Sequence, residues 1–511
     1  MEQERGPAMT HDPRLERLDP CRLKVRNPQG IDATLFARED VPVEGAAVAE
    51  LLAMLQLRET VERVAQAAGG FDEPPAIERV AVTPDFHKAA GIPVGTVMKT
   101  RGFVVPQAIG NDVNCGMRLH LTDLDADDVP ARLDELESAC RRLYFEAGRS
   151  IPMTRRQRMG LLTNGLMGLL EETPADFREG LWPLFHEAGV EKQLSRIDRN
   201  GSLPAKHVWG LDDSFLGGDE PSRDAQIGSI GGGNHFVEIQ RVEKVLDGAV
   251  AHAWGLKRGK VVVMVHTGSV GVGHVCGGWV REALKAAYPS ALKHPENGIF
   301  VLSSGRGAAT ERFWDALHNA ANFAFANRMW LALMAWAALR EVFGEVSSEL
   351  LYDAPHNLVW EEDGAFVHRK GACPARDALA LAETPFRYEG EPVLVPGSMG
   401  ASSFVLVGGG NAEALSSASH GAGRALSRGE AAKGHDEEFD AFMKRFRVVT
   451  PVDFRRADLR MRRDILDKKL AEIKQEAPHA YKGIGPIVRT LEGAGMARPV
   501  AELSPLMTVK G

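Results

Sequence analysis

Four histidines of this chain lie in contexts that suit chemistry. His235 occurs in GGGNHFVE, His266 in VHTGS, His356 in DAPHN and His420 in SHGAGR. Each lies at the end of an apolar run or beside small residues, which leave room for a ligand next to the ring. An imidazole nitrogen can hold a metal ion or act as a nucleophile.

A carboxylate and a thiol extend this set. Asp112 and Cys115 lie three positions apart in a glycine-bounded turn, GNDVNCGM. Together with several imidazoles they form the ligand set expected for a borderline metal such as Mn, Zn or Fe, and one thiolate can bridge two ions. The spacing is long-range, however, and no local zinc pattern such as CxxC…HxxxH supports it. The residues alone therefore leave a metal site and a structural role both open.

Strands are the elements expected to position these side chains. The apolar run KVVVMV predicts a buried strand that ends at His266, and a strand over 349–352 leads into His356. The sequence also predicts strands and tight turns over 80–122, strand-turn-strand over 393–407, and helices over 51–68, 129–146, 309–343 and from 453 to the end.

Composition sets limits on the class of protein. The chain has 511 residues, of which 44% are hydrophobic and 25% charged, enough to build a sizeable globular core. Five cysteines without a CxxC pair argue against a disulfide framework and for a reducing, cytoplasmic location. The longest apolar stretch, 329–339, is too short to span a bilayer, so we expect a buried helix there and no membrane partner.

The net charge of −8 neither shows nor excludes a nucleic-acid substrate, because phosphate binding depends on local Lys, Arg or metal ions. No GxxxxGK[ST] motif is present, so a P-loop nucleotide site is not supported.

Many separate motifs resemble, in the same order, those of the RtcB family of RNA ligases, which join an RNA 3′-phosphate or 2′,3′-cyclic phosphate to a 5′-hydroxyl. The matching segments are 84–87 (PDFH), 111–119 (NDVNCGMRL), 231–239 (GGGNHFVEI), 266–274 (HTGSVGVGH), 321–328 (ANFAFANR), 356–357 (HN), 368–372 (HRKGA), 396–400 (PGSMG), 419–424 (SHGAGR), 480–484 (AYKGI) and the terminal VKG. Residues 1–25 and 150–225 are poorly covered by the resemblance.

The resemblance implies an α+β fold, with a β-rich core that carries a dinuclear metal site and a surrounding helical shell. We expect a loose N-terminal tail over 1–25 and a single catalytic domain over 26–511, with an elaborated lobe at about 150–225. It also implies two Mn²⁺ ions held by Asp112, Cys115, His235, His266 and His356, with the Cys115 thiolate bridging them.

The same resemblance implies GTP as a co-substrate and His420 as the residue that becomes guanylylated. GMP would then pass to the RNA 3′-phosphate, and the 5′-hydroxyl would displace it, in RNA repair or tRNA splicing. The implied contacts to guanine and GMP are Asn234, Glu238, Ser398, Ser403, His420, Gly421, Ala422, Gly423 and Lys510. Glu238 can accept hydrogen bonds from guanine N1 and N2, and Lys510 can donate to O6 or N7. Without the resemblance, a lysine at the position of Lys510 would be interpreted as part of a frayed chain end.

Several residues stay ambiguous. Arg424 could contact RNA or form a salt bridge, the pair Arg369 and Lys370 could bind phosphate or be solvated, and Asp85 matches a family acidic position without an assigned role. Val270 stands in GSVG where the family has GSRG, and a valine cannot bind phosphate as a guanidinium does.

The stretch PDFHKAAGIPVG also departs from the commoner family pattern, and it contains Lys88. This lysine is a hypothetical substitute for the arginine that Val270 replaces. The alternatives to a ligase are a metal-dependent phosphoesterase acting on RNA ends and a non-ligating RNA-end-binding protein. The sequence does not decide whether an archease-like activator is required.

Overall fold

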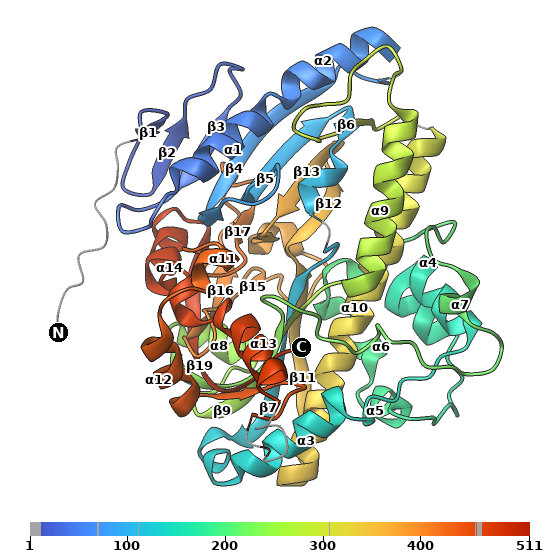
Figure 1. Cartoon of the computed structure of the whole chain (residues 1–511), viewed down its shortest axis with the longest axis vertical. Coiled ribbons are helices and arrows are strands. Elements are labelled where there is room, and N and C mark those ends of the chain that lie inside the picture. The colour runs from blue at the N-terminus through green and yellow to red at the C-terminus, as the bar shows by residue number, and fades with distance from the viewer. Residues whose placement is uncertain (1–11, 69–70, 111, 306, 455, 457–461) are drawn as a thin grey trace.

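Two large β-sheets form the core of the computed structural model, which describes residues 12–68, 71–110, 112–305, 307–454, 456 and 462–511 (Figure 1). The seven-stranded sheet has the order β1 (Leu15–Arg17), β2 (Arg22–Val25), β3 (Ala33–Phe36), β4 (Ala76–His87), β5 (Val94–Arg101), β13 (Ala365–Lys370), β12 (Asn357–Glu362). The second sheet has the order β11 (Ser348–Pro355), β7 (Gly116–Asp125), β9 (Lys260–Thr267), β8 (Phe236–Val245), β19 (Ala497–Val509), β16 (Ser403–Gly408), β15 (Pro392–Val395), with β18 (Arg447–Val449) beside β19.

Two short ribbons connect these sheets to the loops around them. They are β6 (Phe103–Val104) with β10 (Leu302–Ser303), and β14 (Ala372–Pro374) with β17 (Ser417–Ser419). The second ribbon ends directly before His420, so it fixes where that side chain enters the molecule.

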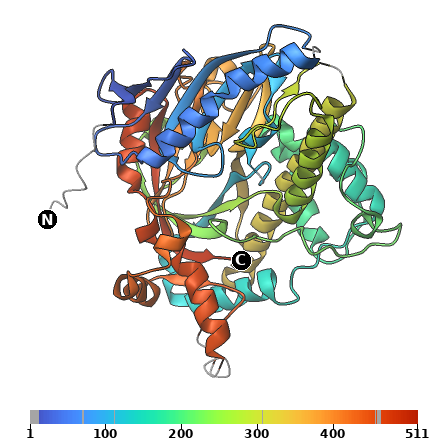
Figure 2. The same ribbon diagram turned by 45° about the horizontal axis from the view of Figure 1, so that its top comes forward.

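Helices cover the outer faces of the sheets, which confirms the expected α+β fold with a β-rich core and a helical shell (Figure 2). They are α1 (Gly45–Leu55), α2 (Leu57–Ala68), α3 (Leu133–Phe145), α4 (Arg155–Glu171), α5 (Trp182–Glu187), α6 (Val190–Gln193), α7 (Asp213–Leu216), α8 (Gly248–Trp254), α9 (Val270–Ala287), α10 (Ala308–Phe343), α11 (Arg428–Ala431), α12 (Asp436–Arg445), α13 (Arg463–Lys474) and α14 (Ile484–Gly493). Apolar residues of α1 and α2, such as Leu51 and Val61, pack on β4 and β5 in one cluster.

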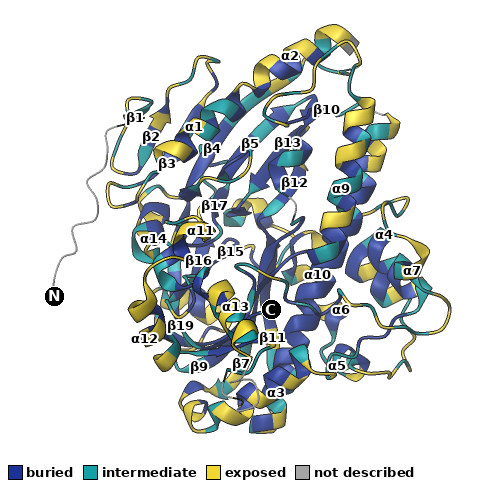
Figure 3. Ribbon diagram, in the orientation of Figure 1, coloured by how far each residue is buried: buried dark blue, intermediate teal, exposed yellow. Residues whose placement is uncertain are grey.

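The longest helix, α10, is buried along most of its 36 residues (Figure 3). It includes the apolar stretch 329–339, so the prediction of a buried helix there is confirmed. Within the described part of the chain, no helix is both long enough and apolar enough to cross a bilayer.

Residues 150–225, the expected lobe, form α4 to α7 and pack against α10. Asn322 of α10 secures this packing, because its side-chain amide donates to the carbonyls of Leu162 and Leu203 and accepts from the Leu203 amide.

The prediction of a loose tail over 1–25 was wrong for its described part. Residues 1–11 lie outside the described residues, but β1 and β2 form an antiparallel hairpin at the edge of the seven-stranded sheet. Leu23 and Val25 point into the core, whereas Lys24 between them is exposed. This period-2 alternation is short, and the mixed charges around it concealed it.

The expectation of a helical chain from 453 to the end is confirmed for α13 and α14 but was wrong for Ala497–Val509, which form the strand β19. Pro499 and Pro505 within it argue against a strand, since proline cannot donate to a sheet ladder. The structure accommodates them with register shifts, one of which lies between Pro505 and Met507.

Candidate active site

Antiparallel pairing brings the candidate metal ligands to one edge of the second sheet, which has eight strands. Cys115 precedes β7, His235 precedes β8, His266 is near the end of β9, and His356 follows β11. Strands that run in opposite directions alternately begin and end at the same edge, so these four positions meet although 241 positions separate the first from the last in sequence.

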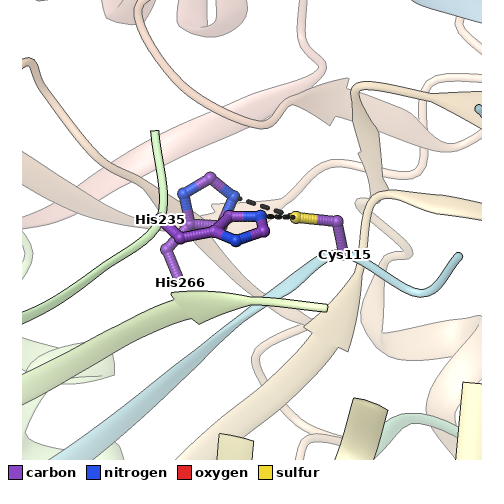
Figure 4. A group of neighbouring side chains, drawn as sticks. All are labelled: Cys115, His235 and His266. Atoms are coloured by element: carbon purple, nitrogen blue, oxygen red, sulfur yellow. Dashed lines mark hydrogen bonds between the residues drawn. The ribbon is translucent and has the colours of Figure 1, made fainter. Parts of the chain in front are cut away.

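The donor atoms lie at distances that suit shared ions. The Sγ atom of Cys115 is 3.3 Å from Nε2 of His235 and 3.3 Å from Nε2 of His266 (Figure 4). His266 Nε2 is in turn 3.3 Å from His356 Nε2, and His235 Nε2 is 2.8 Å from an Asp112 carboxylate oxygen. Two donors about 2.0–2.3 Å from one ion, at ligand angles of about 90–110°, would be about 2.8–3.8 Å apart.

These five donors form a chain in the order Asp112, His235, Cys115, His266, His356, with the sulfur in the middle. Cys115, His235 and His266 are all buried and could hold one metal ion. Because the sulfur has two donors on each side, the order suits two ions that share the thiolate.

Buried polar atoms without a hydrogen-bond partner also support a metal site at this position. Among the described residues, neither carboxylate oxygen of Asp112 has a hydrogen-bond donor, although both are buried; the contact to His235 is close but lacks hydrogen-bonding geometry. Such atoms cost free energy unless something else satisfies them. A cation bound here would satisfy both.

Backbone carbonyls orient two of the imidazoles. His235 Nδ1 donates to the carbonyl of Ile230 and His266 Nδ1 donates to the carbonyl of Asn234. Since Nδ1 then carries the proton, each Nε2 lone pair faces the sulfur, as is usual for histidines that bind metals.

Electrostatics at Asp112 and Cys115 run in opposite directions. Burial raises the pKa of Asp112, but the neighbouring His235 imidazole outweighs it and holds the pKa at about 2. Burial and the Asp112 charge raise the pKa of the Cys115 thiol well above its usual value. A bound metal ion would instead lower the pKa of the Cys115 thiol, because a thiol that coordinates a metal loses its proton.

A buried arginine on α10 fixes the loop that carries Cys115. Arg328 donates to both oxygens of Asn114, to the carbonyl of Thr267 and to Asp353. The sequence motif contained Arg328 but gave no sign of this role, since its partners are distant in sequence.

His420 lies next to the metal-ligand cluster. Its ring centroid is 4.6 Å from that of His356, and its Nδ1 is 2.6 Å from the Asp85 carboxylate, which also accepts from the His420 amide. Burial raises the pKa of Asp85, but the charge of His420 and hydrogen bonds from His420 and Thr83 outweigh it and lower the pKa below its usual value. Asp85 is thus a carboxylate that keeps the proton of His420 on Nδ1 and leaves the lone pair on Nε2.

The turn after His420 depends on a glycine. Gly423 has φ +73°, and a Cβ there would lie 2.2 Å from the carbonyl oxygen of Asp85. Any larger residue would push Asp85 away from His420.

A pocket of about 260 Å³ joins all these groups. Its lining includes the expected residues Asp112, Cys115, Asn234, His235, Glu238, His266, His356, Ser398, His420, Gly421, Ala422, Gly423 and Lys510. Cationic side chains of Lys370, Arg424 and Arg428 also line it, so this acidic chain has local positive charge where an anion would bind.

Glu238 and Lys510 meet through the pairing of β8 with β19, in which Glu238 lies opposite Thr508. Glu238 accepts from Gln240 and from Thr508, and burial raises its pKa to about 7. Lys510 donates to the carbonyl of Gly233, and burial lowers its pKa to about 8. Lys510 is therefore ordered and buried rather than a frayed terminal residue.

Other candidates are placed outside the pocket or are already engaged. Ser403 lies behind it, where its hydroxyl accepts from Gln240 and from the Gly397 amide. Arg369 is buried and bonded to Ser417, Glu362 and the Leu415 carbonyl, so its role is structural, whereas Lys370 does line the pocket.

Arg424 reaches the pocket but is held by Glu476 and by the carbonyls of Leu426 and Gln475. Arg428, which sequence reasoning missed, also contacts Glu476 but leaves 61% of its side chain exposed.

Val270 begins α9 with φ 42°, a conformation that β-branched residues rarely adopt. It lines a separate hollow that shares Asp112, Asn234, His235 and Arg428 with the main pocket. The departure from the family motif therefore lies on the side of the candidate metal ligands that is formed by Asp112 and His235, in a hollow that His420 does not line.

A second histidine group, His435, Glu438 and His479, has donor atoms close enough for a metal ion. Its two rings stack at 4.5 Å with an interplanar angle of 10°. Imidazole lone pairs lie in the ring plane, so parallel stacked rings do not aim them at one ion.

Comparison with known proteins identifies the family to which this chain belongs. A family model described as tRNA-splicing ligase RtcB matches residues 66–511. The tRNA-splicing ligase RtcB of Thermococcus kodakarensis is 32% identical over 97% of this chain and 99% of its own length. The RNA-splicing ligase RtcB of Mycobacterium tuberculosis is 33% identical over 86% of this chain and 98% of its own. With this coverage, and with the metal-ligand and His420 motifs gathered in one pocket, the chain belongs to the RtcB family.

Proposed function

We propose that this protein is an RNA ligase that joins an RNA 3′-phosphate or 2′,3′-cyclic phosphate to a 5′-hydroxyl through a histidine–GMP intermediate. The observation that carries the proposal is the pocket in which His420, oriented by Asp85, lies against the Cys115-centred chain of metal donors. The names of the relatives, which are RNA-splicing and tRNA-splicing ligases, support a role in RNA repair or tRNA splicing.

Two Mn²⁺ ions are the proposed cofactors. Asp112, His235 and Cys115 would hold one, and Cys115, His266 and His356 the other, with the thiolate shared. When bound, such ions offset the charge of phosphates and orient the attacking and leaving oxygens.

GTP is the proposed co-substrate. The buried carboxylate of Glu238 is suited to accept from guanine N1 and N2, while the Lys510 ammonium is suited to donate to guanine O6 or N7. Asn234 and Ser398 also line the pocket, and the 421–423 turn can bring backbone amides close to phosphate.

His420 then acts as the nucleophile. Its Nε2 lone pair forms a bond to the GTP α-phosphorus and pyrophosphate leaves, while Asp85 stabilises the positive charge that develops on the ring. GMP passes from His420 to the RNA 3′-phosphate, and the 5′-hydroxyl displaces it.

The test is incubation with α-³²P-labelled GTP and Mn²⁺, followed by denaturing electrophoresis, for wild type and His420→Ala. A protein-bound label that is acid-labile, alkali-stable and absent from the variant would establish the intermediate. Metal-loaded protein without label would exclude this mechanism. Release of phosphate from RNA ends would then indicate a phosphoesterase, and binding without turnover an RNA-end-binding protein.

The need for an archease-like activator is tested in the same assay. Multiple turnover by the purified chain alone would show that none is required.

A further inference from the structure

His87 is a second imidazole that faces the pocket, and nothing assigned so far uses it. It ends β4 and lines the same cavity as His420. Its Nδ1 lies 2.8 Å from the backbone carbonyl of Asp85. A carbonyl oxygen only accepts, so Nδ1 carries the ring proton and Nε2 carries the lone pair.

The Nε2 atom of His87 is open to the pocket. Among the described residues it has no hydrogen-bond partner, and it is absent from the buried polar atoms that lack one. The ring itself is partly buried, which fixes its orientation.

Asp85 therefore positions two rings in the same way. Its carboxylate binds Nδ1 of His420 and its carbonyl binds Nδ1 of His87. Both rings consequently present an unprotonated Nε2 to one cavity. One is placed to attack phosphorus, and the other is placed to accept a proton nearby.

The two sheets divide the pocket between the substrates. Glu238 and Lys510, the proposed guanine contacts, belong to the eight-stranded sheet. His87, Val94 and Lys370 lie at the ends of β4, β5 and β13 of the seven-stranded sheet, where His87 pairs with Val94. With guanine on the first side, the second side is left for the RNA ends.

A cationic side chain marks that second side. Lys370 lines the pocket beside His87 and also lines an adjoining hollow that includes Gln107 and Arg281. The two cavities share Lys370, so a phosphate-bearing strand in the hollow would lie next to this cation.

We propose that His87 is a catalytic residue whose Nε2 accepts the proton of the RNA 5′-hydroxyl in the closing step. The O5′–H bond breaks and its proton moves to Nε2. The O5′ electron pair forms the bond to the activated 3′-phosphorus, and the bond from that phosphorus to the bridging oxygen of GMP breaks, so GMP leaves with the electron pair. This inference rests on the proposed ligase function.

The charge state of the ring fits this role. Burial lowers the pKa of His87, the hydrogen bond to the Asp85 carbonyl and the Asp85 charge oppose this, and His420 and Lys482 add to it, which leaves the pKa at about 4. The ring is thus a neutral acceptor near neutral pH, and anionic phosphates bound beside it would raise its pKa and increase its basicity.

The decisive variant is His87→Asn, because the asparagine amide can still donate to the Asp85 carbonyl but has no basic nitrogen facing the pocket. His87→Ala provides a site for rescue by added imidazole. His252→Asn is the matched control, since His252 is an exposed histidine of α8 that does not line the pocket.

Each step is followed separately with guanylylated protein and labelled RNA. We expect His420 labelling and GMP transfer to the RNA 3′-phosphate at wild-type rates, accumulation of the activated RNA, and closing slowed by about 10²–10⁴-fold in both His87 variants. Imidazole should partly restore closing in His87→Ala, and His252→Asn should close at the wild-type rate.

Normal closing in His87→Asn would overturn the inference. So would an equal loss of labelling and closing, which would make His87 a positioning residue for Asp85. Wild-type protein that never forms the GMP adduct would instead refute the proposed function, so the two failures are distinguishable.

Discussion

Replacing Asp85 by asparagine tests how the structure prepares His420. The carboxylate lies 2.6 Å from His420 Nδ1 and is fully buried. A hydrogen bond to a charged group contributes about 1.5–3 kcal/mol, so its loss slows the step that charges the ring by about 10- to 150-fold, at 1.36 kcal/mol per tenfold. An amide donor facing Nδ1 would also move the proton to Nε2 and remove the attacking lone pair, and the corresponding change in serine proteases costs about 10⁴-fold.

The assay is single-turnover guanylylation with α-³²P-labelled GTP. Asp85→Asn should label at least about tenfold more slowly than wild type, with unchanged metal content. Asp212→Asn, which removes the charge but keeps a capping oxygen at the N-cap of α7, outside the pocket, is the control and should label normally. Labelling of Asp85→Asn at the wild-type rate would refute the argument that this carboxylate sets the reactive tautomer.

Four further outcomes follow from the site. Lys510→Met should weaken GTP binding by about 10- to 100-fold, the loss of one charge-assisted hydrogen bond, as measured by calorimetry. GTP affinity should be highest between the pKa values of Glu238 and Lys510, about 7 and 8, because Glu238 is protonated below this window and Lys510 is uncharged above it; a flat pH profile would contradict this assignment. Cys115→Ala should reduce the bound metal below two ions by mass spectrometry, whereas Cys276→Ala should not, since Cys276 is a buried thiol remote from the other donors. Val270→Gly should lower the melting temperature, because losing the buried valine side chain and adding a flexible glycine together cost about 2–4 kcal/mol, against about 1–3 kcal/mol of relieved backbone strain; a higher temperature would show that the strain costs more than the side chain contributes.

Much of the scaffold could be predicted from local patterns. The buried strand ending at His266 and the helix over 309–343 correspond to β9 and α10. Both are long or strongly apolar, so local periodicity dominates over tertiary effects. β2 and β19 were missed because one is only four residues long and the other contains two prolines.

The sequence nominated residues for the site, but only the tertiary structure shows which of them face the pocket. Motif resemblance nominated Lys510, but only the tertiary structure shows that this residue, which follows β19 directly, is buried. Conversely, Arg369 and Ser403 were plausible ligand contacts by type, and packing places both behind the pocket.

The sequence by itself determined the residue types: a carboxylate, a thiol and imidazoles able to bind metal, a further histidine among glycines, and the family they resemble. Tertiary structure alone decided their order in space and their protonation. Antiparallel pairing brings strand ends from distant parts of the chain to one edge, and buried hydrogen bonds from Asp85 and from backbone carbonyls select which ring nitrogen carries the proton. Both effects depend on contacts between residues far apart in sequence, which local spacing cannot specify.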